Sequence, residues 1–407
     1  MKNKHSHLPL YLLTVFWISQ TISLFGDRLN NFSLAALINR FAENPSLTLS
    51  KLYLAMYLPI FVLAPLVGIL LDKLDKRWVL VLTDIARGII VLLIPFFFLR
   101  TGSFLPVFAL VFILSTGNLF FLPAKSALIP ELVPHDKLVK TNSVLWVAGI
   151  IGFIGGFLGG GLIFDYLSWP ACFLLDGLTY FLSALLLAFV AFYSRGAGRQ
   201  PVKRPNGSLS IFSALRESFT GIRNNPGILA PLGIQAMIFL AGGGFSVLGI
   251  VAIKAASPPG SSMGISAAGL STGIGMGLGS ILANHLPDSP ISRKWIEIGL
   301  FGLFIPASAG MAIGGLSLLC LGGFIAGFVA SPLIIISESE LQRNISISMR
   351  GRIFAFREIV TKSVFLLSAF LFTSFQEFAG TAILLVVLGL FLALIGIYWI
   401  VFQSSRQ

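Results

Sequence analysis

Charged residues are scarce in this sequence, and their scarcity argues against a soluble globular protein. Only 11% of the 407 residues are Asp, Glu, Lys or Arg, whereas 56% are hydrophobic and the mean hydropathy is +0.91. A soluble chain of this length needs a much larger share of charge to cover its surface. The composition therefore predicts a membrane protein.

Cysteine and histidine are also rare, which bears on enzymatic chemistry. The two cysteines, Cys172 and Cys320, lie in separate apolar segments, so the sequence argues against a disulfide framework and a metal site. The four His residues form no cluster with Asp or Glu at the spacing of a metal site or a catalytic triad. A Walker-type Gly-rich loop is missing as well, which excludes ATP as a driving force. We therefore expect no cofactor, no metal and no enzymatic activity, with a membrane-embedded enzyme such as a lipid-modifying transferase as the alternative class.

Long apolar runs are what the sequence has in abundance. About 20 apolar residues in a helix span a hydrocarbon core ~30 Å thick. Charged and Pro/Gly-rich breaks divide the chain into twelve such runs, which predict an all-α polytopic membrane protein with twelve transmembrane helices in two six-helix bundles. The predicted helices cover residues 10–38, 50–72, 78–99, 104–123, 142–164, 170–193, 226–253, 264–285, 295–314, 316–338, 353–375 and 380–402.

The longest polar segment, residues 195–225, separates the two sets of helices. We predict an N-terminal six-helix bundle over 1–194, a cytoplasmic linker over 195–225 and a C-terminal six-helix bundle over 226–407. Within the linker, the apolar spacing over 209–222 fits an amphipathic helix on the membrane surface. A solvated tether fits the same segment equally well.

Basic residues give the predicted helices an orientation. The loops on the side of the N-terminus hold most of the 28 Lys and Arg residues, among them Lys125, whereas the opposite loops hold only Arg40, Lys51, Arg100 and Lys254. Because cytoplasmic loops are enriched in Lys and Arg, we expect a multi-pass protein of the cytoplasmic (inner) membrane with both termini in the cytoplasm. The net charge of +12 is spread over short loops that lack interleaved aromatic residues, so we expect no nucleic-acid partner.

A motif follows the second predicted helix: Gly68-Ile-Leu-Leu-Asp72-Lys-Leu-Asp75-Lys76-Arg77. Gly68 permits close approach of a neighbouring helix, Asp72 can accept hydrogen bonds at a helix N-terminus, and the basic pair can bind carboxylates. The motif resembles the signature loop of the major facilitator superfamily. The resemblance implies that Gly68, Asp72, Lys76 and Arg77 brace the cytoplasmic gate in the outward-facing state. A tight turn with orienting charges is the alternative interpretation.

Further stretches resemble macrolide-efflux-like and siderophore-exporter-like members of that superfamily: Pro123-Ala-Lys-Ser-Ala-Leu-Ile-Pro130-Glu131-Leu-Val-Pro134, Asp84-x-x-Arg87 and Leu175-Asp176-Gly-Leu-Thr-Tyr180. This resemblance implies efflux of a drug-like or macrolide-like molecule. A rival resemblance, to bacterial lysophospholipid transporters, rests on Phe25-Gly26-Asp27 and Pro123-Ala124-Lys125. Both resemblances imply an amphipathic cargo.

Two stretches depart from the superfamily pattern. The counterpart of the gate motif, Gly279-Ser-Ile-Leu-Ala-Asn284-His285, has no Asp at the spacing of the first copy, so the two cytoplasmic braces are not equivalent. The glycines over 149–161 resemble the Gly-rich motif of drug antiporters but lack its proline. They therefore favour dense helix packing over antiport.

Charges inside the predicted helices are the candidate functional groups, because a charge at a helix centre costs about 2.5–3.5 kcal/mol on insertion. Asp27 lies ~5 Å from the middle of the first predicted helix, and Asn31 shares its face one turn later. We assign Asp27, Arg28 and Asn31 to the substrate and proton pathway, since a carboxyl whose exposure alternates could take and release a proton. A permanent ion pair of Asp27 with Arg28, or with a cation of another helix, is the alternative.

Two further pairs have spacings that allow pairing along one helix. Asp84 and Arg87 stand at i, i+3, and Glu358 and Lys362 stand at i, i+4. We assign all four to an intramembrane charge relay with a structural or gating role. Asp176 lies near the outer end of its predicted helix, where we expect it to reach water.

The aromatic content indicates the kind of cargo. The chain has 37 Phe and 6 Trp residues, more than helix packing needs. Aromatic walls suit large, flat or amphipathic ligands. We therefore expect a monomeric secondary transporter, surrounded by membrane lipids, that moves a small-molecule or lipid-like substrate by alternating access and uses protons as the coupling ion.

Overall fold

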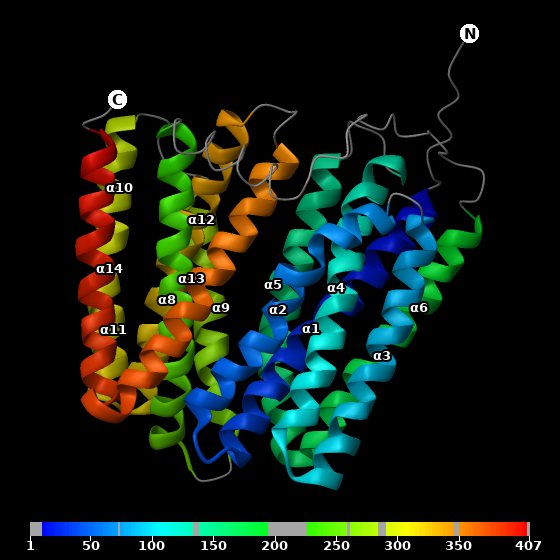
Figure 1. Ribbon diagram of the computed structural model, residues 1–407, viewed down its shortest axis with the longest axis horizontal. Helices are drawn as coiled ribbons and strands as arrows, with labels where there is room; N and C mark the ends of the chain where they lie inside the picture. The colour runs from blue at the N-terminus through cyan, green and yellow to red at the C-terminus, as the bar shows by residue number, and fades with distance from the viewer. Residues whose placement is uncertain are drawn as a thin grey trace. The chain divides into compact units, whose positions relative to one another are not determined.

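The computed structural model describes residues 10–71, 74–132, 138–193, 226–258, 261–283, 290–345 and 350–404, and every regular element within them is helical (Figure 1). The elements before residue 194 are α1 (Leu10–Phe41), α2 (Pro45–Leu71), α3 (Lys76–Thr101), α4 (Phe104–Leu132), α5 (Leu138–Leu162), the π-helical turn η2 (Ile163–Leu167) and α6 (Trp169–Tyr193). Those after residue 225 are α8 (Pro226–Ala256), α9 (Met263–Ala283), α10 (Pro290–Gly302), α11 (Phe304–Ile313), α12 (Leu316–Asn344), α13 (Arg350–Ala379) and α14 (Thr381–Ser404).

Most of these helices have the length and composition of membrane spans. Ten stretches in the described part of the chain are long and apolar enough to cross a membrane, and Ile151–Leu167 adds a shorter apolar helix. The predicted fold class, an all-α polytopic membrane protein, is therefore confirmed.

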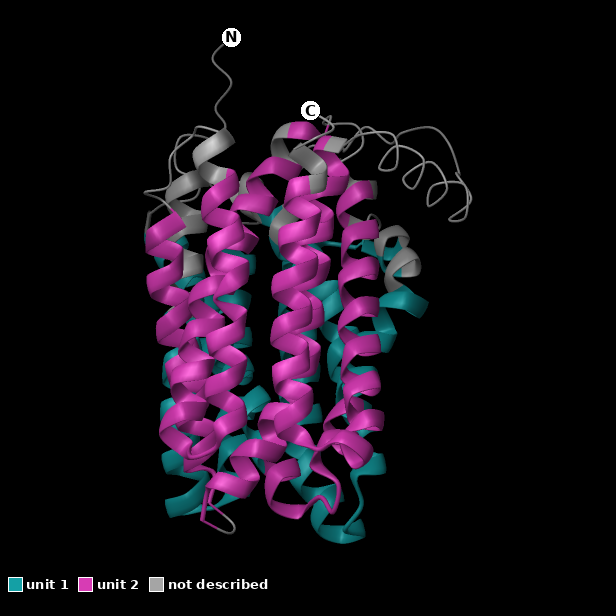
Figure 2. Cartoon of the chain, turned by 90° about the vertical axis from the view of Figure 1, so that its left-hand side faces the viewer, with its two compact units in different colours: residues 1–36, 51–207 teal, residues 37–50, 208–407 magenta. Residues whose placement is uncertain are grey.

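The chain divides into two compact units (Figure 2). Unit 1 holds residues 1–36 and 51–207, and unit 2 holds residues 37–50 and 208–407. The predicted linker, 195–225, lies outside the described residues. The end of α1 and the beginning of α2 thus group with unit 2.

One predicted helix is interrupted. In place of a single helix over 295–314, the chain forms α10 and α11, which meet at Leu303. Pro306 explains the break, because a proline in a helix has no N–H to donate to the carbonyl four residues earlier, here that of Gly302, and its ring crowds that carbonyl. On the other side of the break, the amide of Leu303 donates to the carbonyls of Gly299 and Leu300 at the end of α10.

The glycines of α5 bring its backbone against α1 in unit 1. A Cβ atom on Gly156 would lie 2.7 Å from Cβ of Arg28, and one on Gly152 would lie 3.2 Å from the backbone nitrogen of Phe25. The contact at Gly156 leaves no room for a side chain, and the contact at Gly152 is tighter than ordinary van der Waals packing. The prediction that this stretch serves dense packing is confirmed.

In unit 2 the Gly-rich helix α9 packs in the same way. A Cβ atom on Gly275 would lie 2.1 Å from the carbonyl oxygen of Phe324, and one on Gly279 would lie 2.3 Å from that of Phe328, both on α12.

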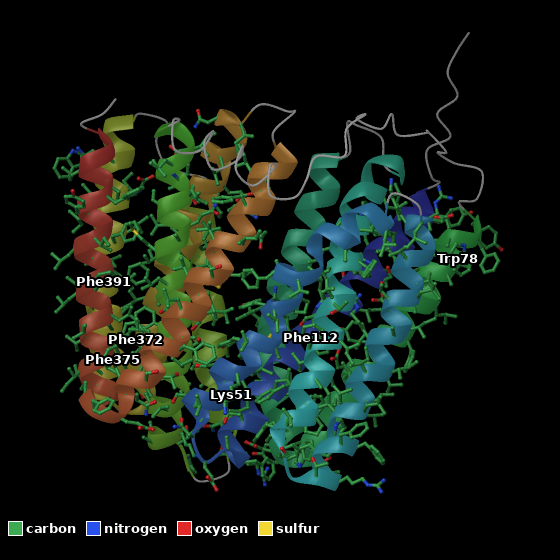
Figure 3. The ribbon with its side chains drawn as sticks, in the orientation of Figure 1. Lys51, Trp78, Phe112, Phe372, Phe375 and Phe391 are labelled. Carbon is green, nitrogen blue, oxygen red and sulfur yellow. The ribbon has the colours of Figure 1, made fainter. Side chains whose placement is uncertain are left out.

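Aromatic side chains occupy both units, for example Phe112 on α4 and Phe372, Phe375 and Phe391 on α13 and α14 (Figure 3).

Candidate functional site

A cluster of charged and polar side chains lies inside unit 1, and Asp27 of α1 is its most accessible member. The carboxyl of Asp27 accepts a hydrogen bond from the hydroxyl of Tyr180 on α6. Its Oδ1 atom lies 3.8 Å from Nη1 of Arg87 on α3, and its side chain is 31% exposed. Asp27 is thus both within reach of a cation and open to solvent or ligand.

Arg87 is the centre of this cluster. Its side chain is 1% exposed and forms an ion pair with Asp84, one turn earlier on α3. Nη1 of Arg87 also donates to Oδ1 of Asn118 on α4 at 2.8 Å. The guanidinium lies over the rings of Phe121, at 4.0 Å, and Tyr180, at 4.7 Å. A planar cation with several donors suits this set of contacts.

Asp84 is fully satisfied by its neighbours. Besides Arg87, it accepts a hydrogen bond on Oδ2 from the hydroxyl of Ser183 on α6 at 2.7 Å. The predicted intrahelical pairing of Asp84 with Arg87 is confirmed. Its complete burial, together with its two donors, indicates a fixed ion pair.

Helix periodicity explains why these side chains meet. Asp176, Tyr180 and Ser183 are buried together on one face of α6, and Asp84 and Arg87 are buried on one face of α3. The hydroxyl of Tyr180 and the amide of Asn118 were not among the residues singled out from the sequence. Polar residues at helical spacing from an intramembrane charge were the available signal.

Lys125 is a correction to the sequence interpretation. It was counted in a cytoplasmic loop, but it lies in α4, half-buried, with its ammonium 5.8 Å from the centre of the Phe121 ring. α4 continues to Leu132, past the predicted end at residue 123, and this extension keeps Lys125 within the helix.

Arg28 and Asn31 do not join the cluster around Arg87. The guanidinium of Arg28 lies 5.5 Å from the centre of the Phe153 ring on α5, and within the described residues its buried Nε has no hydrogen-bond partner. Asn31 is half-buried on α1. Asp27 therefore faces the cation of another helix rather than its chain neighbour.

The gate motif is described in part. Gly68 lies in α2, Asp72 lies outside the described residues, and Lys76 and Arg77 begin α3. Asp75 caps α3, since its carboxylate accepts a hydrogen bond from the backbone N–H of Arg77 at 3.0 Å. From the sequence, only Asp72 was expected to make such a contact at a helix N-terminus.

A second charged cluster lies in unit 2. Arg357 of α13 pairs with Glu338 of α12 and, at 2.5 Å, with Glu358. Gln235 of α8 donates to the same Glu338 at 3.0 Å. Lys362 lies with its ammonium 4.5 Å from the centre of the Phe239 ring. Glu358 thus pairs with Arg357, its neighbour along α13.

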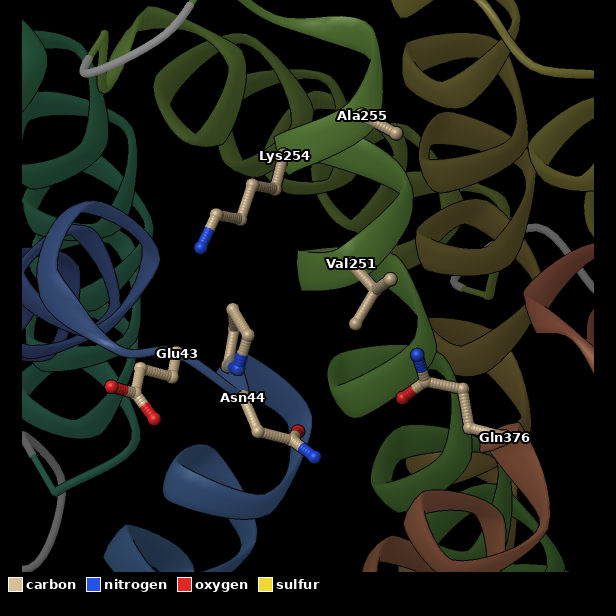
Figure 4. A pocket seen from close by; sticks show the side chains of 7 residues that line it. Glu43, Asn44, Val251, Lys254, Ala255 and Gln376 are labelled. Atoms are coloured by element: carbon tan, nitrogen blue, oxygen red, sulfur yellow. The ribbon is translucent and has the colours of Figure 1, made fainter.

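A cavity of about 400 Å³ lies in unit 2 beside the α1–α2 turn, residues 42–50 (Figure 4). Lys254 of α8 points toward this turn and donates to the carbonyl of Ala42 at 3.0 Å. Ser46 donates to Gln376 of α13 at 2.6 Å, and the hydroxyls of Ser50 and Thr373 lie 2.9 Å apart. Polar contacts therefore fasten the α1–α2 turn to α8 and α13.

Asp176 corrects another expectation. It was placed near water, but it is 0% exposed and belongs to the buried face of α6.

As for metal binding, His, Cys, Asp and Glu form no group of three or more that could hold an ion in the part of the chain that the structure describes.

The chain is similar to one protein family and to several known transporters. The family model of the Major Facilitator Superfamily matches residues 16–356. The MFS-type transporter YfiS of Bacillus subtilis is 25% identical over 96% of this chain and 92% of its own length.

Three further similarities are to two exporters and to one solved structure. Macrolide efflux protein A of Streptococcus pyogenes is 25% identical over 56% of this chain and 55% of its own length. The putative bacilysin exporter BacE of Bacillus subtilis is 30% identical over 41% of this chain and 40% of its own length. The solved structure of a bacterial homologue of the iron transporter ferroportin, in an inward-facing state, covers 98% of this chain and 100% of that chain with a TM-score of 0.69 and 19% identity.

Proposed function

Because the chain belongs to the major facilitator superfamily, we propose that it is a secondary active transporter that exports an amphipathic or lipophilic small molecule in exchange for protons. Alternating access moves the substrate. The observation that supports proton coupling is the environment of Asp27, whose part-exposed carboxyl lies beside the buried guanidinium of Arg87.

Asp27 is the proton-binding group of this proposal. Its contact with Arg87 is 3.8 Å long, and that guanidinium already binds Asp84 and Asn118. Protonation of Asp27 therefore removes a weak ion pair without leaving Arg87 uncompensated. A carboxyl with this freedom can bind a proton from one side of the membrane and release it to the other.

The nature of the substrate rests on two supports. The chain is similar to proteins named for macrolide efflux and bacilysin export. Aromatic rings such as Phe121 and Phe239 lie beside Lys125 and Lys362, and this combination suits amphipathic molecules. A lysophospholipid or siderophore transporter of the same fold is the second candidate, and Lys125 favours it because an ammonium attracts phosphate or carboxylate groups.

The remaining roles follow the predicted assignments. Gly68, Asp72, Lys76 and Arg77 brace the cytoplasmic gate, and the charge clusters of Asp84–Arg87 and of Glu358 and Lys362 respond to its movement. The protein works as a monomer in the cytoplasmic membrane, with both termini in the cytoplasm, as the distribution of basic residues predicts.

Transport in proteoliposomes tests this proposal. Radiolabelled erythromycin is the probe, and its uphill movement is measured with and without a pH gradient. We expect Asp27→Asn to keep exchange between equilibrated pools but to lose gradient-driven transport, whereas the exposed carboxyl of Glu377 serves as the matched control in Glu377→Gln. Full gradient-driven transport by Asp27→Asn contradicts the role of Asp27. Retention of labelled lysophospholipid, with no effect on erythromycin, favours the second candidate.

A further inference from the structure

Asp176 is a buried carboxyl that lacks an adequate hydrogen-bond donor. It is 0% exposed, and within the described residues its Oδ2 atom has no hydrogen-bond partner. Its Oδ1 atom lies 3.4 Å from the hydroxyl of Thr179, but that hydroxyl is closer, at 2.7 Å, to the backbone carbonyl of Asp176. The hydroxyl of Thr179 therefore donates its one proton to the backbone carbonyl of Asp176, and the carboxyl of Asp176 gains at most a weak hydrogen bond from it.

The two other carboxyls of the cluster have donors that Asp176 lacks. Asp84 binds Arg87 and accepts from Ser183, and Asp27 accepts from Tyr180 and faces Arg87. No basic nitrogen lies within 4.0 Å of Asp176 in the described part of the chain. An ionised carboxylate in such a place would carry a large desolvation cost, whereas a neutral carboxylic acid avoids it.

The backbone of α1 closes the space around Asp176. A Cβ atom on Gly26 would lie 2.4 Å from Oδ1 of Asp176 and 2.0 Å from Oγ1 of Thr179. Only a glycine permits this approach, so α1 lies directly on the carboxyl and excludes water from it. A proton on Asp176 can therefore leave only when α1 and α6 separate at this point.

The cluster around Asp176 holds three carboxyls but one buried arginine. Asp27 of α1 and Asp84 of α3 already share Arg87 of α3, and Tyr180, one turn after Asp176 on α6, donates to Asp27. Lys125 of α4 lies over Phe121, beside Arg87. A third carboxylate would thus compete for one arginine.

We propose that Asp176 is a second proton-binding group of the transporter, protonated in this conformation and sealed by the contact of α1 with α6 at Gly26. This inference rests on the proposed proton coupling. When α1 and α6 part, the O–H bond of Asp176 breaks, the proton passes to water, and the carboxylate remains. Reprotonation from the opposite side precedes the return of α1 onto α6. Asp27 and Asp176 then each carry one proton in the transport cycle.

Infrared spectroscopy of the purified full-length protein at neutral pH is the direct test, because it needs no substrate. A protonated carboxylic acid has a C=O stretching band that a carboxylate lacks, and the band shifts in D₂O. We expect a component of this band in the wild-type protein to be absent from Asp176→Asn and retained in Glu377→Gln, which changes an exposed carboxyl. A band that is unchanged in Asp176→Asn overturns the proposal.

Thermal unfolding gives a second measurement. An amide replaces a neutral acid with little change in volume or charge, so Asp176→Asn should unfold within a few degrees of the wild type. Severe destabilisation of Asp176→Asn would show that an ionised partner has been lost, and it too overturns the proposal.

Transport stoichiometry separates this inference from the proposed function. The number of protons moved per erythromycin is measured from the pH gradient that balances a fixed erythromycin gradient. We expect the ratio to fall by about half in Asp176→Asn, since one of two coupled groups is lost. An unchanged ratio overturns the transport role of Asp176. Wild-type erythromycin transport without any proton movement would defeat the proposed coupling itself, while the infrared assignment of Asp176 would stand.

Discussion

Asp27 lies 3.8 Å from the guanidinium of Arg87, whereas Asp84 binds the same guanidinium directly. Hydrogen bonds between ionised groups are normally about 2.7–2.9 Å long, so Asp27 is an associate of Arg87 rather than its main partner. Arg87 thus has a fixed partner in Asp84 and a more weakly held partner in Asp27.

Replacing Asp84 should cost far more stability than replacing Asp27. Asp84→Asn leaves a buried arginine without its principal counter-ion, a loss of about 3–5 kcal/mol. Asp27→Asn changes a part-exposed side chain at a longer distance, so its effect should be smaller. Thermal unfolding of both variants in detergent measures the difference. Equal unfolding temperatures would contradict the assignment of Asp84 as the fixed partner.

The gate motif gives a prediction about transport without a stability effect. Asp72→Asn should reach normal membrane abundance but transport erythromycin about tenfold more slowly, the change in a two-state ratio produced by ~1.4 kcal/mol. Asp75→Asn is the matched control, because asparagine caps a helix about as well as aspartate. Wild-type rates in Asp72→Asn at equal abundance would remove this residue from the gate.

Packing of α5 on α1 can be tested with two glycines of one helix. Gly156→Ala places a methyl group 2.7 Å from Cβ of Arg28 and should destabilise the protein by about 1–3 kcal/mol. A methyl group on Gly159 meets nothing within 4 Å, so Gly159→Ala should be neutral or stabilising. Unfolding temperatures in the reverse order would show that α5 does not pack on α1 as described.

A disulfide that fixes the α1–α2 turn to α13 should block transport reversibly. Ser50 and Thr373 have hydroxyls 2.9 Å apart, so cysteines at both positions should form a disulfide after Cys172 and Cys320 have been replaced by alanine. The turn continues into α1 and α2, whose remaining lengths belong to unit 1. We expect oxidation to stop erythromycin transport and reduction to restore it. The single-cysteine variants are the controls, and transport that persists in the oxidised protein would show that the turn stays in place throughout the cycle.

The sequence predicted the helices well because bilayer thickness imposes a length and a composition on each of them. The break at Leu303 was not predicted, although Pro306 stands in the middle of the helix expected over 295–314. The Asp84–Arg87 pair followed from spacing within one helix. Contacts along a single helix need no knowledge of its neighbours.

Contacts between helices were less predictable. Hydropathy does not fix the rotation of a helix, so the meeting of Tyr180 with Asp27 and of Asn118 with Arg87 was missed. The burial of Asp176 depends on Gly26, which lets α1 lie on α6. The position of Asp176 near the end of its predicted helix suggested contact with water, because distance from a helix end does not reveal which residues of other helices cover a side chain.

The ion pair within α3 also bears on how the protein is made. Asp84 and Arg87 stand one turn apart on one helix, so their pairing needs neither α4 nor α6. During synthesis α3 is complete before Asn118 and Ser183 have left the ribosome. Two separate charges would each cost about 2.5–3.5 kcal/mol on entry into the bilayer, but a pre-formed pair enters as a neutral unit. Biogenesis of α3 can therefore precede the assembly of the site that its arginine later holds together.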